Sequence, residues 1–268
     1  MAYRRFFVVM DPQQPASEQI ALRRARQLLG EEGGHIHGFA AVHGSSDRSS
    51  ALAAAERKLG ELLQSQSEAA VHVDAEVEWS RNPEQAAVRA CSRLGADLLI
   101  KQAEGSEHYL LRHSPAPVLL CRPGTEAPYA RVLAAIALED NDARHEALNN
   151  RVISAAQRIA RSSGAALHSV SALEGPPNVG QILKIIEDED VEKLTGEEMI
   201  SRSFGIRREQ VHIDYGPARN VIVETAEKTA ADLLVIGTVS RSGLSGALVG
   251  NTAEKLLVDL PIDILTVS

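Results

Sequence analysis

Short apolar runs alternate along this chain with longer segments in which apolar residues recur every third or fourth position. In the first half, the runs cover residues 6–10, 35–42, 73–79, 96–100 and 117–121. Short apolar runs bounded by turn residues are typical of strands, whereas the longer period is typical of helices packed by one face. The pattern therefore predicts alternating strands and helices, with helices over residues 21–29 and 51–63 and a third from Asn82 on. There Pro83 and Gln85 complete a helix-start pattern with Asn82.

The second half repeats this order. Its apolar runs cover residues 132–138, 166–170, 211–215, 233–236 and 261–267, and its helices are expected over residues 148–159, 191–204, 217 onward and 252–260. The fourth runs match almost letter for letter, since residues 96–100 read ADLLI and residues 231–235 read ADLLV. Such a repeat predicts two copies of one structural unit.

Alternating strands and helices imply parallel sheets with right-handed crossovers and helices on both faces. We therefore expect two tandem doubly wound parallel-sheet α/β domains, residues 1–124 and residues 125–268, separated near Gly124. In such sheets, ligands bind beyond the carboxyl ends of the strands.

A segment rich in glycine and hydroxyl residues follows the apolar run 233–236, at the place where a ligand is expected. Backbone N–H groups at a helix start attract anions, and glycines let the backbone approach a ligand closely. Asn251 and Glu254 resemble a capping box that opens the last helix. A surface loop without a ligand explains the same composition. The candidate residues are Gly237, Thr238, Val239, Ser240, Arg241, Gly243, Gly250, Asn251 and Thr252.

The first half differs at this place, because Lys101 stands where the second half has Ile236, and Gln102 replaces Gly237. If one half keeps a ligand site, we expect it to be the second.

The two repeats resemble universal stress protein domains of the UspA superfamily, and their tandem arrangement is similar to that of the E-type members. The residues that carry this resemblance are Gly237-Thr238-Val239, residues 250–254 (GNTAE) and residues 145–149 (HEALN). The resemblance covers nearly the whole chain and implies the adenine nucleotide alpha hydrolase-like fold.

Nucleotide-binding members of this family hold the phosphates of ATP with a loop of glycine, two residues, glycine, nine residues, glycine, then serine or threonine. The spacing is kept here, but Ser240 replaces the second glycine and Asn251 takes the serine or threonine position. The family's first strand also ends in an aspartate near the nucleotide; Asp11 keeps it in the first half, whereas Ala137 replaces it in the second. The resemblance implies ATP or AMP in the second domain, with Ala137 and Val170 beside the glycine loop.

Net charge, the length of the apolar runs and the cysteine count argue against several classes of function. The chain has 28 Lys and Arg against 36 Asp and Glu, a net charge of −8, which argues against binding nucleic acid or an anionic membrane surface. The start resembles no signal peptide and no apolar run is long enough to span a bilayer, so we expect a cytoplasmic protein. Cys91 and Cys121 fit neither a disulfide framework nor a zinc site.

Other groups of potentially functional residues give weaker evidence for a site. His35 and His37 lie two apart on a strand, with His43 further along, but no further ligand is apparent and no metal site is predicted. A Walker lysine, a dinucleotide fingerprint and a nucleophile elbow are all absent from the sequence. Enzymatic activity is thus poorly supported, with slow ATP hydrolysis implied only by the family resemblance.

Two functions therefore remain open. The first is a stress-response protein whose second domain binds an adenine nucleotide. The second is a scaffold with degenerate sites that acts through protein contacts or another small ligand, as the departures at Gln102, Ala137 and Ser240 suggest. Dimerisation along residues 117–121 and 261–267 would serve this second function, and the chain can equally pair its own halves as a pseudo-dimer.

Overall fold

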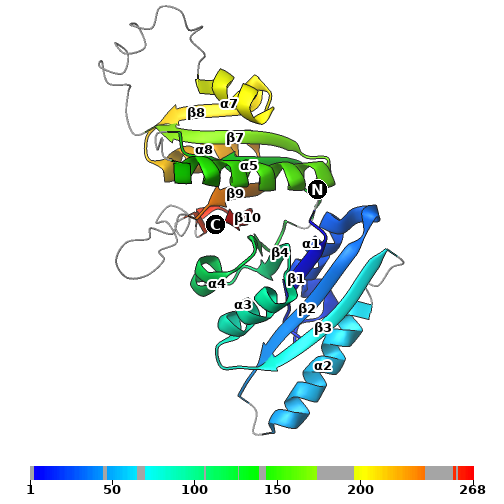
Figure 1. Ribbon diagram of the computed structural model, residues 1–268. Helices are drawn as coiled ribbons and strands as arrows, with labels where there is room; N and C mark the ends of the chain where they lie inside the picture. The colour runs from blue at the N-terminus through cyan, green and yellow to red at the C-terminus, as the bar shows by residue number, and fades with distance from the viewer. Residues whose placement is uncertain are drawn as a thin grey trace, which may run out of the picture.

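The computed structural model describes residues 3–44, 47–64, 70–105, 107–125, 127–138, 143–173, 196–238, 256–257 and 259–268. These residues form one 10-stranded sheet in the order β3-β2-β1-β4-β5-β10-β9-β6-β7-β8. Strands β3 and β8 lie at opposite ends of the molecule (Figure 1). The doubly wound α/β class is confirmed, since within each half all strands pair in parallel and the first strand lies between the second and the fourth.

The strands follow the apolar runs closely. Those of the first half are β1 (Arg5–Val9), β2 (Gly34–Val42), β3 (Val71–Trp79), β4 (Leu98–Gln102) and β5 (Val118–Cys121). Those of the second half are β6 (Arg131–Ala135), β7 (Ala166–Leu173), β8 (Val211–Tyr215), β9 (Leu233–Gly237) and β10 (Asp263–Val267).

The helices also agree with the periodic segments, apart from the short helix at residues 108–113, which was not predicted. The first half contains α1 (Ile20–Leu29), α2 (Arg48–Gln64), α3 (Pro83–Leu94) and α4 (His108–His113); the second contains α5 (Ala143–Ser163), α7 (Gly196–Phe204) and α8 (Ala218–Thr229). Pro83 is the first residue of α3 as predicted, but the Asn82 side chain makes no capping hydrogen bond. Of the helix expected over residues 252–260, only residues 256–257 and 259–260 are described, and 256, 257 and 259 are helical. None of the described helices is both long and apolar enough to cross a membrane.

The two halves share one sheet, because β5 and β10 pair antiparallel and join the five strands of each half. Leu119 lies opposite Leu265, and both side chains are fully buried. Each strand would otherwise leave an apolar edge with unpaired backbone groups, a feature that favours pairing with another strand. The two halves therefore pair within the chain. Both β5 and β10 have a neighbouring strand on each side, so neither offers a free edge to a second chain. The domain boundary near Gly124 stays a prediction.

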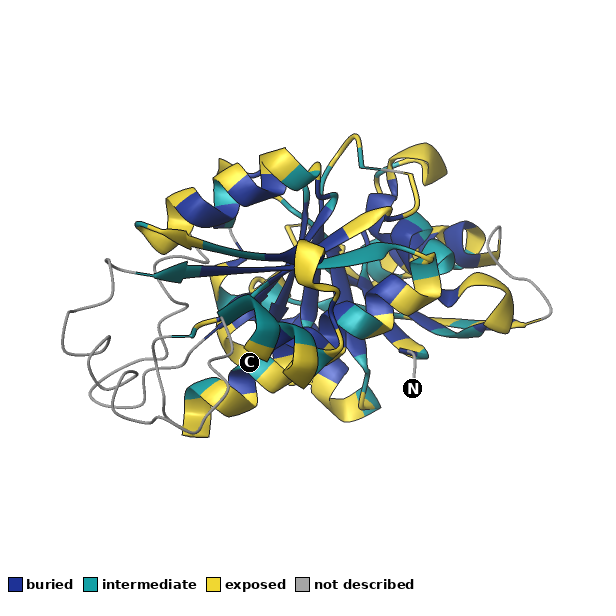
Figure 2. Cartoon of the chain, turned by 90° about the horizontal axis from the view of Figure 1, so that it is seen from above, coloured by how far each residue is buried: buried dark blue, intermediate teal, exposed yellow. Residues whose placement is uncertain are grey.

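Helices cover both faces of the sheet, as Figure 2 shows from above. Successive strand residues point to opposite faces, so Phe6 and Val8 belong to one apolar core while Phe7 belongs to the other. Helices α1, α2, α5 and α7 close the first core, and α3, α4 and α8 close the second. Each core runs through both halves, which accounts for the continuous apolar strands.

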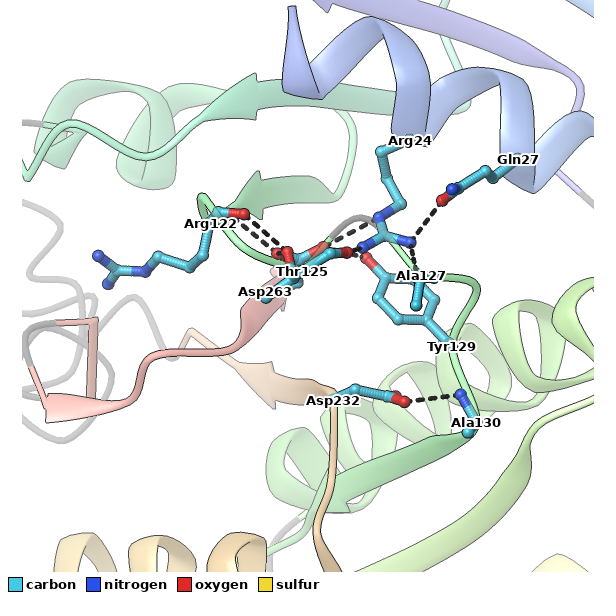
Figure 3. Close-up of polar contacts among 9 residues, drawn as sticks. All are labelled: Arg24, Gln27, Arg122, Thr125, Ala127, Tyr129, Ala130, Asp232 and Asp263. Atoms are coloured by element: carbon cyan, nitrogen blue, oxygen red, sulfur yellow. Dashed lines mark hydrogen bonds and ion pairs between the residues drawn. The ribbon is translucent and has the colours of Figure 1, made fainter. Parts of the chain in front are cut away.

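A buried polar network ties the halves together at the start of β10. Asp263 is fully buried and accepts hydrogen bonds from Arg24 Nε at 3.0 Å and from the Tyr129 hydroxyl at 2.6 Å. Its other oxygen accepts from the Arg122 N–H and the Thr125 hydroxyl, both at 2.7 Å (Figure 3). The buried charge of Asp263 is thus fully compensated, as buried charges require.

Candidate functional site

The order of strands reverses between β6 and β9, and a ligand of a doubly wound sheet binds at this switch point. Ala135, at the end of β6, lies opposite Val170 of β7 and Ile236 of β9. The predicted residues Ala137, Gly237 and Thr238 therefore lie at the carboxyl ends of β6 and β9, and Val170 of β7 lies level with the end of β6. We refer to this place as the second-half crevice.

Helix α5 borders this crevice with its first turns. The Asn149 side chain donates to the Ala137 carbonyl at 2.6 Å and accepts from the Ala137 N–H at 3.0 Å. Ala137 is exposed, with only a methyl group at this position. Gln19 makes a similar contact in the first half, donating to the carbonyl of Asp11. A side-chain amide thus holds the backbone beyond the first strand in both halves.

Val170 lies inside the sheet, and its side chain is buried in the core. The Val170 carbonyl accepts a hydrogen bond from the Ile136 N–H at 3.0 Å, and the Ser171 hydroxyl donates to the Ile136 carbonyl at 2.9 Å. The backbone of β7 is thus hydrogen-bonded to the segment that follows β6.

Gly237 and Thr238 end β9 next to β10. A Cβ atom on Gly237 would come within 2.6 Å of Leu148 Cδ2, so this glycine lets α5 pack directly against the strand. Thr238 is nearly buried, and both its N–H and its hydroxyl donate to the Val267 carbonyl, at 2.7 and 3.3 Å. The remaining predicted residues, Val239, Ser240, Arg241, Gly243, Gly250, Asn251 and Thr252, lie outside the described part of the chain.

In the first half, a carboxylate of the chain itself lies beyond the end of β4. Position 103 corresponds to Thr238, since the Ala103 N–H donates to the Cys121 carbonyl as the Thr238 N–H donates to Val267. Beyond it, the N–H groups of Glu104 and Gly105 both donate to the carboxylate of Glu107, which is 3% exposed. The buried Lys101 ammonium lies 3.3 Å from the same carboxylate. Glu107 thus occupies the position at which an anionic ligand would meet backbone donors and a cation.

Glu84 from α3 lies next to this carboxylate. Its Oε2 accepts from the Tyr109 N–H at 3.1 Å, while its Oε1 is buried without a hydrogen-bond partner in the described structure. Burial raises the pKa of Glu84, although the Tyr109 hydrogen bond and the Lys101 charge oppose the shift. The contacts among Lys101, Glu107 and Glu84 were not predicted from the sequence. Their one visible sign there is a lysine at position 101, where the second half has an apolar strand residue.

The cysteines behave as small core residues. Both are buried and unpaired. Burial raises the pKa of Cys91 to about 11 and raises that of Cys121 further above its usual value. Neither thiol is activated, because a reactive cysteine has a lowered pKa.

Histidines make cross-strand contacts near both ends of the sheet. His35 and His37 of β2 contact Asp74 of β3, and His168 of β7 lies 3.1 Å from His212 of β8. The sequence showed the pair on β2 but not the partners, because His72 and Asp74 join it only through the register of β2 and β3.

A hollow of about 330 Å³ lies between α1 and α5, lined by Arg4, Glu32, Arg158 and Arg161 among others. It opens at the amino edge of the sheet, near the ends of both helices, and contains none of the predicted site residues. It therefore has no part in the second-half crevice.

Comparison with known proteins assigns the chain to a family. The model of the universal stress protein family matches residues 129–268, which is the half that contains the second-half crevice. The chain belongs to the universal stress protein family. Universal stress protein E of Escherichia coli K12 is 27% identical over 99% of this chain and 94% of its own length. The Haemophilus influenzae homologue of universal stress protein E is 26% identical over 99% of this chain and 97% of its own.

Two solved structures share the fold of this chain. A functionally unknown protein from Pseudomonas aeruginosa PAO1 is 33% identical, with a TM-score of 0.78 over 99% of this chain and 92% of that one. A universal stress protein from Archaeoglobus fulgidus shares the fold at 15% identity, with a TM-score of 0.67. The full-length matches identify a universal stress protein of the E type, and membership in this family supports a role in the stress response.

Proposed function

We propose that this universal stress protein binds an adenine nucleotide, ATP or AMP, in its second half. The observation that carries the proposal is the place of Ala137, Gly237 and Thr238 at the carboxyl ends of β6 and β9, where the strand order reverses, with Val170 level with the end of β6. The phosphates would lie beyond Thr238, along the glycine segment, and the base would lie toward Val170. The cytoplasmic location expected from the sequence stays a prediction.

The contrast between the halves supports this choice. In the first half, Glu107 satisfies the backbone donors after β4, and Lys101 neutralises it. In the second half, the position equivalent to Lys101 is Ile236, so the end of β9 carries no buried ammonium group. A ligand phosphate in the second half would take the role that Glu107 has in the first.

Two matched substitutions test the proposal, because the repeat places Ala137 and Asp11 at equivalent exposed positions. Ala137→Trp fills the second-half crevice, whereas Asp11→Trp adds the same bulk to the first half. In calorimetric titrations with ATP and AMP, we expect Ala137→Trp to weaken binding about tenfold or more and Asp11→Trp to leave it unchanged. Loss of binding in Asp11→Trp alone would assign the nucleotide to the first half.

A scaffold function is the second candidate, favoured by one observation. The polar groups described at this edge already have protein partners. The Asn149 side chain hydrogen-bonds the Ala137 backbone, and the Val267 carbonyl accepts from the Thr238 N–H and hydroxyl. A scaffold would release no nucleotide when the freshly purified chain is denatured and its small molecules are analysed by mass spectrometry. Stoichiometric release of an adenine nucleotide would eliminate this candidate.

A further inference from the structure

A cluster of metal-ligating side chains lies on strands β2 and β3, away from both crevices. In the register of these strands, His35 lies opposite His72, and His37 lies opposite Asp74. Residues two apart on a strand point to the same face, so these side chains share one face of the sheet. One ligand atom from each of His35, His72 and Asp74 lies within 4.8 Å of the other two.

Asp74 is already held in the centre of this cluster. Its Oδ1 lies 2.9 Å from His35 Nε2 and 2.6 Å from His37 Nδ1. The rings of His35 and His72 lie 4.8 Å apart between centroids. The second oxygen of Asp74, Oδ2, makes no hydrogen bond within the described part of the chain, and neither does either ring nitrogen of His72. The side chains of Asp74 and His72 both reach solvent.

The inner histidine adds an independent observation. His37 is 7% exposed, and its Nε2 is buried without a hydrogen-bond partner among the described residues. Nε2 lies 3.7 Å from Glu76 Oε2, one step further along the same face of β3. The carboxylates of Asp74 and Glu76 thus both face the His37 ring, from neighbouring positions on one face of β3.

We propose that His35, His72 and Asp74 bind a divalent transition-metal ion of the zinc class. Two imidazoles and one carboxylate match the donor preference of Zn²⁺, and a water molecule would complete four-coordination. The ligand atoms must close to tetrahedral spacing, since zinc–nitrogen bonds are about 2.0–2.1 Å long. The exposed His72 would close the distance by side-chain rotation.

The second half provides an internal comparison. By strand register, His168 corresponds to His37, Gln210 to Asp74 and His212 to Glu76. His168 and His212 contact one another, but an amide replaces the central carboxylate. The second half therefore lacks the anionic ligand, and we expect the metal in the first half alone.

The test uses the untagged full-length chain, stripped of metal with a chelator and titrated with Co²⁺ and then Zn²⁺. We expect one equivalent of Co²⁺ to produce the visible absorption of a tetrahedral site, which Zn²⁺ then abolishes. His72→Asn and Asp74→Asn should each weaken binding about tenfold or more, because each removes a ligand. His43→Asn and His212→Asn are the controls and should bind as the original chain does.

Several outcomes would overturn the proposal. One is the absence of Co²⁺ and Zn²⁺ binding in the original chain, which would leave the cluster as a hydrogen-bonded surface pair. Another is equal binding in His72→Asn and Asp74→Asn, and a third is loss of binding in His212→Asn, which would move the metal to the second half. Circular dichroism of each variant separates loss of a ligand from loss of the fold.

Discussion

Arg24 in α1 and Asp263 in β10 are 239 positions apart in the sequence, yet their side chains form an ion pair in the interior. Arg24 Nε lies 3.0 Å from Asp263 Oδ2, and the two side chains are 2% and 0% exposed. Arg24 also donates to the carbonyls of Thr125 and Ala127, in the segment that joins the halves (Figure 3). One guanidinium thus connects the first half, the joining segment and the second half.

Removing one partner of this pair should destabilise the whole chain. Asp263→Ala leaves the Arg24 charge buried and unpaired, and we expect a loss of about 3–5 kcal/mol in the free energy of unfolding. Urea denaturation measures it. Glu61→Ala is the control, since Glu61 pairs with Lys58 on the surface and its loss should change stability by less than about 1 kcal/mol. A small effect of Asp263→Ala would show that the halves hold together without this pair.

Gly237 should be required for packing as well as for any ligand. Gly237→Ala places a methyl group against Leu148, and overpacking of this kind costs about 1–3 kcal/mol. Leu148→Ala in the same chain should recover part of that loss by making room. Gly60→Ala is the matched control: Gly60 lies within α2 with open space around its Cα, so alanine should stabilise by about 0.5–1 kcal/mol. Thermal unfolding distinguishes these results.

Glu107 should act as an internal anion. Glu107→Ala leaves buried Lys101 and the N–H groups of Glu104 and Gly105 without their carboxylate, with an expected loss of about 3–5 kcal/mol. Glu104→Ala is the control, because Glu104 also contacts Lys101 but is largely exposed. Added phosphate should raise the melting temperature of Glu107→Ala more than that of the original chain, since it binds the vacated donors. Equal shifts would contradict the anion role.

The His168–His212 pair should make stability depend on pH. Burial, together with the charges of Arg131 and Arg207, lowers the pKa of His168, and burial with His168 and Lys228 lowers that of His212. Each histidine therefore takes up a proton more readily in the unfolded chain than in the folded one. The stability they contribute is full above the ordinary pKa of about 6.5 and is lost as the pH falls toward the lowered values.

A double variant isolates this effect. His168→Asn with His212→Gln removes both titrating groups, so the decrease in melting temperature between neutral pH and about pH 5 should become smaller. An unchanged decrease would assign the pH dependence to other groups of the chain.

The sequence predicted most of the fold because its local patterns are unambiguous. The runs ADLLI and ADLLV became β4 and β9 within two residues, and the repeat correctly indicated two similar halves. The single sheet was not predictable, because the pairing of β5 with β10 depends on contacts between segments more than a hundred positions apart. Apolar composition predicts that both strands are buried but does not identify their partner.

Polar positions were harder to predict. Arg24 lies four positions from both Ile20 and Leu28 on the buried face of α1, yet the nearby Arg23 and Arg26 hide this signal in the sequence. His72 and Asp74 alternate along β3, and only the register with β2 brings them to His35. The candidate crevice was found because a doubly wound sheet determines where strand ends meet, which needs topology alone.

Hydrogen exchange with and without saturating ATP tests the central claim most directly. We predict slower exchange in peptides that cover residues 135–138 and 237–238, at the ends of β6 and β9, and no change over residues 101–107. Protection confined to residues 101–107, or no protection anywhere at saturation, would contradict a nucleotide site in the second half.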